Sequence, residues 1–276
     1  MQDIGYDKTI TIRKGNIMAE SKTTVKENKP KRARRKNPQT LRPIEYLFSQ
    51  IYDVNSNTVL GYDAELVIND KKLGTLTYDR VASVANRSNL AVRLGKWQIE
   101  EVCELIKRQN SYGKYINRVF ITLSAKFLSK PDFYDQFLKI TGKYEIEHKR
   151  FGIQINEAEL VAGNDTLYEN IVKLREGGAK VIITDFGAES TSLKQLSTLT
   201  VDYVKLNTSF TADIAENERT ESITEGIVDL CGKLGVLVIA DGIDTKEQLN
   251  IMKRMRCFLI QGKYFSTPER ENAAIV

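Results

Sequence analysis

Short apolar runs rich in β-branched residues alternate with amphipathic stretches through the chain beyond residue 43. The apolar runs predict strands at residues 118–123, 151–155, 180–183, 203–206, 236–240 and 258–260. The amphipathic stretches predict helices at residues 78–86, 91–109, 132–141, 165–176, 191–198, 211–233 and 245–254. Upstream, residues 46–52 and 59–62 flank a polar turn and predict a β-hairpin. So many βα units within about 230 residues predict a closed (β/α) barrel, which carries its functional groups at the carboxyl ends of its strands.

Polar residues stand at the carboxyl end of each strand expected in this barrel. They are Asp63, Thr122, Gln154 with Asn156 and Glu157, Thr184 with Asp185, Lys205 with Asn207, Asp241 with Asp244, and Gln261. The strand interiors are apolar, so polar groups at all of these ends favour a shared site over chance capping.

Asp185 is the first candidate, because it directly follows the buried run 181–183. Two interpretations remain open: Asp185 belongs to the site, or it caps the helix that follows. Asp241 and Asp244 likewise either belong to the site or flank the turn into the helix near residue 245. Lys205 lies in an apolar strand and needs a carboxylate partner, for which Asp185 is the natural candidate.

Composition fits a soluble protein, with 41% hydrophobic and 28% charged residues among 276. No apolar run approaches the roughly 20 residues that cross a bilayer, and no signal peptide is apparent, so we expect a cytoplasmic protein. Cys103, Cys231 and Cys257 show no metal-binding or disulfide spacing. The single histidine, His148, lies in a charged stretch where a solvated loop is expected, which argues against a histidine-based triad.

The net charge of +5 is concentrated near the N-terminus. Residues 22–42 carry +8, which leaves about −3 for the remainder. The basic residues are Lys22, Lys26, Lys29, Lys31, Arg32, Arg34, Arg35, Lys36 and Arg42. Residues 1–43 are predicted to form a disordered basic arm, which is either a solvated tail or a contact for nucleic acid or an anionic surface.

Residues 1–17 raise a separate hypothesis about the start of translation. Arg13-Lys14-Gly15 can be encoded by a purine-rich run of the ribosome-binding type, and Met18 lies a few codons beyond it. On this hypothesis residues 1–17 are not translated, and intact mass of the native protein would test it.

The strand ends carry motifs that resemble those of EAL-type cyclic-di-GMP phosphodiesterases. The motifs are Gly61-Tyr-Asp-Ala-Glu-Leu, Ile155-Asn-Glu, Thr184-Asp-Phe-Gly, Tyr203-Val-Lys-Leu-Asn, Ile239-Ala-Asp-Gly-Ile-Asp-Thr and Gln261-Gly-Lys-Tyr-Phe-Ser-Thr-Pro. The resemblance covers residues 44–268 and leaves residues 269–276 as a C-terminal tail. It implies a bacterial signalling protein with a modified TIM (β/α)8-like barrel whose first strand runs antiparallel to the others. It also implies hydrolysis of cyclic-di-GMP to a linear dinucleotide with two magnesium or manganese ions.

The chain departs from the family pattern where the resemblance places metal ligands and phosphate contacts. Asp63 and Asp241 each stand for a glutamate, Thr122 for an asparagine, Gln154 for a glutamate, Thr184 and Asn207 for aspartates, and Val67 for an arginine. Lys205 and Gln261 match the pattern, as does Glu157, which in the family anchors a loop.

The departures reduce the negative charge that is available to bind two divalent cations. Two divalent cations bring +4, whereas the expected mouth offers only Asp63, Asp185 and Asp241, with Lys205 nearby at +1. We therefore predict no metal ion at full occupancy, no cofactor and no assigned catalytic residue, with these four as residual catalytic candidates. The predicted ligand-binding residues are Asp63, Glu157, Asp185, Lys205, Asp241 and Gln261.

The sequence thus favours a degenerate EAL domain without enzymatic activity. It would act as a regulatory module that contacts a protein or nucleic acid, with weak binding of cyclic-di-GMP as a further expectation. The alternative is a divergent metal-dependent phosphodiesterase that uses magnesium or manganese to open cyclic-di-GMP to a linear dinucleotide.

Overall fold

The structure is a computed structural model that describes residues 8–13, 16–21, 43–70, 72–78, 80, 89–188, 196 and 199–275. Its contacts divide the chain into two compact units. One unit comprises Met1–Glu45 with Leu66–Leu90, and the other, the barrel unit, comprises Tyr46–Glu65 with Ala91–Val276.

The first unit contains two antiparallel strand pairs. Strand β1 (Lys8–Arg13) pairs with β2 (Asn16–Ser21), within the segment predicted to be a disordered arm. The end of β4 (Thr58–Asp70) pairs with β5 (Gly74–Thr77), and the Asp70 carboxylate caps their turn by accepting from the backbone N–H groups of Lys72 and Leu73. Residues 22–42 and most of the predicted helix 78–86 lie outside the described residues.

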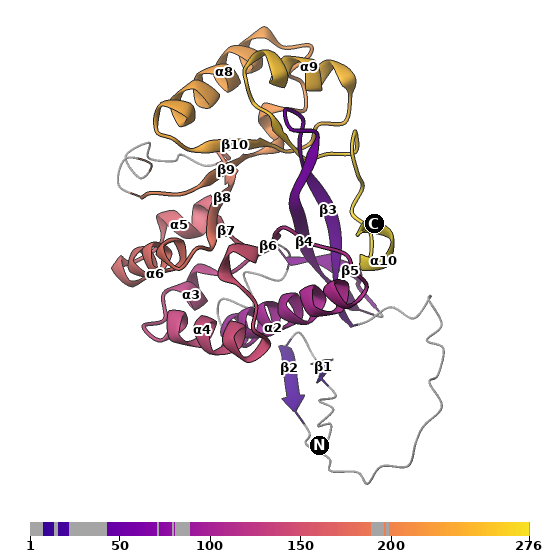
Figure 1. Cartoon of the computed structure of the whole chain (residues 1–276), viewed down its shortest axis with the longest axis vertical. Helices are drawn as coiled ribbons and strands as arrows, with labels where there is room; N and C mark the ends of the chain where they lie inside the picture. The colour runs from indigo at the N-terminus through magenta and orange to yellow at the C-terminus, as the bar shows by residue number, and fades with distance from the viewer. Residues whose placement is uncertain are drawn as a thin grey trace. The chain divides into compact units, whose positions relative to one another are not determined.

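The barrel predicted from the sequence is confirmed. Its strands are β3 (Ile44–Asp53), β4, β6 (Val119–Thr122), β7 (Phe151–Asn156), β8 (Lys180–Phe186), β9 (Tyr203–Leu206), β10 (Leu237–Ala240) and β11 (Leu259–Ile260). They are hydrogen-bonded in the order β3-β11-β10-β9-β8-β7-β6-β4, and a β3–β4 pairing closes the ring. Figure 1 shows β3 and β4 side by side. Strand β3 runs antiparallel to β11, whereas the neighbours from β4 through β6 to β11 run parallel.

Helices connect the parallel strands and cover the barrel. They are α2 (Leu90–Ser111), α3 (Ala125–Leu128), α4 (Phe133–Tyr144), α5 (Glu157–Val161), α6 (Asp165–Glu176), α8 (Glu218–Lys233), α9 (Lys246–Arg254) and α10 (Glu271–Ala274), with 3-10 turns η1 (His148–Arg150) and η2 (Thr208–Phe210). None of these helices combines the length and hydrophobicity needed to span a bilayer. The predicted helix 191–198 falls mostly outside the described residues.

The prediction of one helix over residues 211–233 was wrong at its start. Residues 211–216 form turns, and α8 begins only at Glu218. The side chain of Asn217 accepts hydrogen bonds from the backbone N–H groups of Arg219 and Thr220, so it caps the helix there.

Phe120 fills the barrel interior because the strands on both sides supply glycine. Its fully buried ring belongs to a core cluster with Ile51, Ile182, Tyr203, Ile239 and Leu259. A Cβ atom at Gly61 on β4 would lie 2.7 Å from the Phe120 ring, and one at Gly152 on β7 would overlap the ring. The two glycines therefore make the space that this large side chain occupies.

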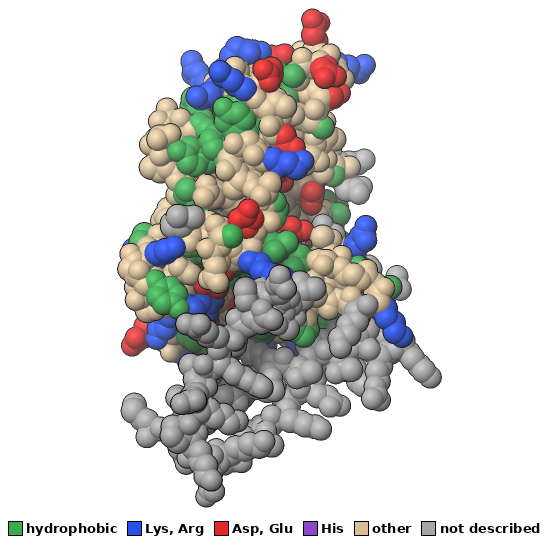
Figure 2. All heavy atoms as spheres, turned by 90° about the vertical axis from the view of Figure 1, so that its right-hand side faces the viewer, with side chains coloured by type: hydrophobic (Ala, Val, Ile, Leu, Met, Phe, Trp, Pro, Cys, Tyr) green, Lys and Arg blue, Asp and Glu red, His purple; other side chains and the backbone are tan. Residues whose placement is uncertain are grey.

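Residues 269–275 are packed against β3 and α2 of the same unit. Glu269 exchanges backbone hydrogen bonds with Phe48 of β3, and the Glu271 carboxylate accepts from Arg108 and Gln109 at the end of α2. Ile275 is buried. On the face shown in Figure 2, basic and acidic side chains are mixed at the upper end, where α8 and α9 lie in Figure 1, and hydrophobic side chains form small groups.

Candidate functional site at the mouth of the barrel

Asp63 on β4 is the centre of a buried polar cluster. One carboxylate oxygen accepts from Gln154 Nε2 at 2.6 Å, and the other accepts from Lys205 Nζ at 2.6 Å and Gln261 Nε2 at 2.9 Å. The side chains of Lys205 and Asp63 are only 7% and 15% exposed. Strands β4, β7 and β9 and the end of β11 thus bring together four of the polar strand-end residues predicted from the sequence.

Asp63 and Lys205 form an ion pair, in which the carboxylate and the ammonium are both charged. Burial alone would raise the pKa of Asp63, but the Lys205 ammonium and the amide donors outweigh it and hold this pKa below its ordinary value. Burial would lower the pKa of Lys205, and the Asp63, Asp241 and Asp185 carboxylates outweigh that effect and raise it. Both groups therefore stay charged at neutral pH.

Asp185 is not the ion-pair partner of Lys205, which corrects the expectation from the sequence. Its two carboxylate oxygens accept from Asn156 Nδ2 at 2.6 Å and Asn207 Nδ2 at 3.3 Å. The backbone of Asp185 has φ of 56°, a left-handed conformation uncommon for residues other than glycine. The side chain is thereby held between the ends of β7 and β9 by neutral amide donors.

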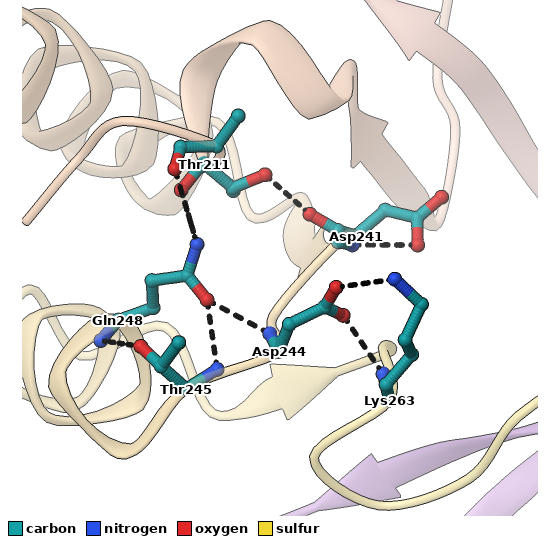
Figure 3. A network of polar contacts seen from close by, with 8 residues as sticks. Thr211, Asp241, Asp244, Thr245, Gln248 and Lys263 are labelled. Atoms are coloured by element: carbon teal, nitrogen blue, oxygen red, sulfur yellow. Dashed lines mark hydrogen bonds and ion pairs between the residues drawn. The ribbon is translucent and has the colours of Figure 1, made fainter.

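Asp241 is the least compensated carboxylate of the mouth. Its side chain accepts from the adjacent backbone N–H of Gly242, and the hydroxyl of Thr211 donates to its carbonyl oxygen at 2.5 Å (Figure 3). Burial raises the pKa of Asp241; the nearby charge of Lys205 opposes this rise, and the charges of Asp63 and Asp185 add to it.

The loops that follow β9, β10 and β11 are joined by the polar network in Figure 3. The Gln248 amide donates to the Thr211 carbonyl and accepts from the backbone N–H groups of Asp244 and Thr245. Thr245 is the N-cap of α9, while the Asp244 carboxylate accepts from the backbone and ammonium groups of Lys263. Asp244 therefore serves the loops rather than the Asp63 cluster.

Glu157, the first residue of α5, contacts the loop after β8 and is 1% exposed. Its carboxylate accepts from the backbone N–H of Gly187 at 2.9 Å. This contact joins the start of α5 to the turn beyond Asp185, so Glu157 contacts the loop and not the Asp63 carboxylate.

Four other residues singled out by the sequence, Thr184, Thr122, Val67 and His148, are buried or engaged in contacts outside the Asp63 cluster. Thr184 is buried, and the carbonyl of Thr122 accepts from Gln98 of α2. Val67 is buried in the first unit. His148 is half-buried against the Phe137 ring and hydrogen-bonds to Thr141 and Gly177, so the expectation of a solvated loop residue was wrong.

One contributor, Ser49, was missed by the sequence reasoning, and another, Asn156, was placed at a strand end but not among the predicted ligand-binding residues. Ser49 of β3 accepts from Gln261 at 2.9 Å, and Asn156 holds Asp185. The signal for Asn156 was its position at a strand end, but its function as a donor depends on the register of β7 with β8. Ser49 lies on the antiparallel strand, where a search of carboxyl ends does not find it.

The donor set does not fit a dinuclear metal centre. Among the residues that the structure describes, no group of three or more His, Cys, Asp and Glu side chains could hold a metal ion. A cation beside Asp63 would face the Lys205 ammonium and two amide N–H groups. Gln154 Oε1 and Gln261 Oε1 are buried without a hydrogen-bond partner, but neutral amide oxygens add no charge compensation.

A closed (β/α) barrel with one antiparallel strand and a polar site at its mouth places the protein in the class of modified TIM barrels. The chain belongs to the EAL family, because the EAL domain matches residues 39–268.

The sequence identity between this chain and individual curated relatives is low. The cyclic di-GMP phosphodiesterase NbdA of Pseudomonas aeruginosa is 27% identical over 195 residues, which are 71% of this chain and 25% of that protein. Curated relatives such as this one are about four times as long as the matched region.

Two solved structures share the fold. The EAL enzyme Bd1971, bound to cAMP and cyclic-di-GMP, has a TM-score of 0.77 and 18% identity, covering 85% of this chain and 64% of that one. The manganese and cyclic-di-GMP complex of Klebsiella pneumoniae BlrP1 has a TM-score of 0.69 and 21% identity, covering 84% and 57%.

Proposed function

We propose that this EAL domain is a cytoplasmic regulatory module that does not hydrolyse cyclic-di-GMP and acts by contacting a protein or nucleic acid. One observation carries the proposal: two amides stand where the family pattern has carboxylates, and both act as donors, Gln154 Nε2 to Asp63 at 2.6 Å and Asn207 Nδ2 to Asp185 at 3.3 Å. Neither amide brings the negative charge that is needed to hold a pair of divalent ions and to activate a water between them.

The remaining carboxylates support the same proposal. Asp185 accepts from two asparagine amides, and burial raises the pKa of Asp241, so its charged form is less favourable than that of an exposed aspartate. The mouth therefore lacks the concentration of negative oxygens that would hold two ions together.

Cyclic-di-GMP is expected to bind weakly. The ligand is a dianion, and the mouth presents Asp63, Asp185 and Asp241 against Lys205, whose charge is already paired with Asp63. Gln154 Oε1 and Gln261 Oε1 offer acceptors for a ligand N–H, but neither can neutralise a phosphate. Titration calorimetry should detect no heat at about tens of micromolar ligand.

A turnover assay tests the proposal. The purified chain and the variant Asp185→Ala are each incubated with cyclic-di-GMP and excess manganese or magnesium, and the linear dinucleotide is quantified. Both proteins should give the same background. Efficient cleavage by the unmodified chain that is lost in Asp185→Ala would support the phosphodiesterase alternative and overturn the proposal.

A further inference from the structure

Tyr112 and Tyr115 are the most exposed aromatic side chains in the described part of the chain, at 67% each. Both stand on the turn that ends α2. Lys114 N–H donates to the Gln109 carbonyl at 3.0 Å, and Gly113 has φ of 74°, as in a Schellman-type helix end. The turn is therefore fixed by backbone bonds, and its two rings remain open to solvent.

A buried cation lies directly beneath one of these rings. Arg150, at the end of η1, is 6% exposed, and its guanidinium carbon lies 4.3 Å from the centroid of the Tyr115 ring. The stack fixes one face of the ring and leaves the side chain largely exposed.

Arg150 lacks the partners that a buried arginine usually has. No described carboxylate forms an ion pair with it, its Nη2 lies 3.4 Å from Asn110 Oδ1, and its buried Nε has no hydrogen-bond partner. The charge of Glu147 attracts Arg150 without forming an ion pair with it, so the buried guanidinium keeps charge that an approaching anion can use.

The groups around Arg150 add positive charge with limited opposition. Lys149 is exposed and paired with the exposed Glu147, and Lys114 donates to the backbone carbonyl of Ile275. Arg118 is 9% exposed and donates to the Lys149 carbonyl. These basic groups and the exposed rings lie together before the first residues of β6 and β7, at the opposite end of the strands from the Asp63 cluster.

We propose that Tyr112 and Tyr115 form a stacking platform for the bases of single-stranded nucleic acid, whose phosphates are attracted by Lys114, Lys149 and Arg150. Exposed rings bind unpaired bases through their π-faces, and basic neighbours follow the phosphodiester backbone. A protein partner usually binds an apolar groove, whereas this surface combines two exposed rings with basic groups. The proposal names one partner class of the regulatory module, and in that respect it rests on the proposed function.

Fluorescence anisotropy with a labelled single-stranded oligothymidylate and its oligouridylate counterpart tests the platform on the full chain. Tyr115→Ala and Tyr112→Ala should each weaken binding roughly tenfold, and Tyr115→Phe should retain it. The slope of affinity against salt should be unchanged in these variants but fall by about 0.7 in Lys149→Gln, because only the last removes a phosphate contact.

Tyr264→Ala, at the other end of the barrel and 42% exposed, is the matched control and should bind as the unmodified chain does. Equal thermal midpoints would show that the variants remain folded. Failure of the chain to bind either oligonucleotide, or full binding by both alanine variants, would overturn the platform. Loss of a protein contact in Tyr115→Ala without any loss of oligonucleotide binding would also overturn it. Turnover of cyclic-di-GMP, measured on the same preparation, reports separately on the proposed function.

Discussion

The Asp63 carboxylate receives three N–H donors, and only Lys205 among them carries a charge. That Lys205 needs a carboxylate was predictable from its apolar strand, but the choice of Asp185 was wrong. The partner depends on the pairing of Asp63 with Phe120 across β4 and β6, and on the left-handed backbone of Asp185. Neither can be read from the order of residues along the chain.

Asp63→Asn should destabilise the protein by about 3 kcal/mol, because it leaves the buried Lys205 ammonium without a counter-charge. The double variant Asp63→Asn with Lys205→Met should recover most of that loss, since it removes the unpaired cation. Urea unfolding of both variants measures the difference. A loss under about 1 kcal/mol for Asp63→Asn would mean that the pair contributes little to stability.

Asp241→Asn should stabilise the protein at neutral pH by about 1 kcal/mol, because burial makes the charged form of Asp241 unfavourable. The folded pKa is raised, so the folded state binds the proton more tightly than the unfolded state. The stability contributed by this proton is present below the unfolded pKa of about 3.9 and is lost as pH rises through the folded pKa.

The difference between variant and unmodified protein should therefore shrink as pH falls toward 4. Thermal unfolding across pH measures this dependence. Asp229→Asn, an exposed residue of α8, is the control and should show no comparable dependence. A pH-independent difference for Asp241→Asn would contradict the assignment.

At the scale of elements, the apolar runs located the barrel strands to within a few residues, except that β4 continues to Asp70, eight residues beyond the predicted end at residue 62. The start of α8 was missed because residues 211–216 continue an amphipathic pattern, whereas the cap at Asn217 fixes the first turn. The sequence also did not predict that the two glycines beside Phe120 make space for its ring. Gly61 and Gly152 are far apart in sequence and meet the same ring only because β4 and β7 both pair with β6.

Gly152→Ala should destabilise the protein by about 2 kcal/mol, since the added methyl group overlaps the Phe120 ring. Phe120→Leu in the same chain should relieve part of the loss by shortening that side chain. Gly226→Ala in α8 is the control: it has open space around its Cβ position and should gain up to about 1 kcal/mol. Equal effects of the two alanine substitutions on the urea midpoint would refute the packing account.

For the molecule as a whole, the repeated βα pattern was enough to predict a closed barrel and the motifs were enough to predict the antiparallel first strand. The packing of residues 269–275 against α2 was not predicted, because it depends on contacts of Glu271 with residues more than 160 positions earlier. The sequence also indicated too few carboxylates at the mouth. Only the structure adds that Asp63 is already neutralised within the protein.

The most direct test of this account is the number of manganese ions bound per chain in the presence of cyclic-di-GMP, measured by equilibrium dialysis and metal analysis. The account predicts that no pair of ions binds, and that Asp185→Ala leaves the manganese content unchanged. Two ions bound per chain at micromolar manganese, lost in Asp185→Ala, would contradict it.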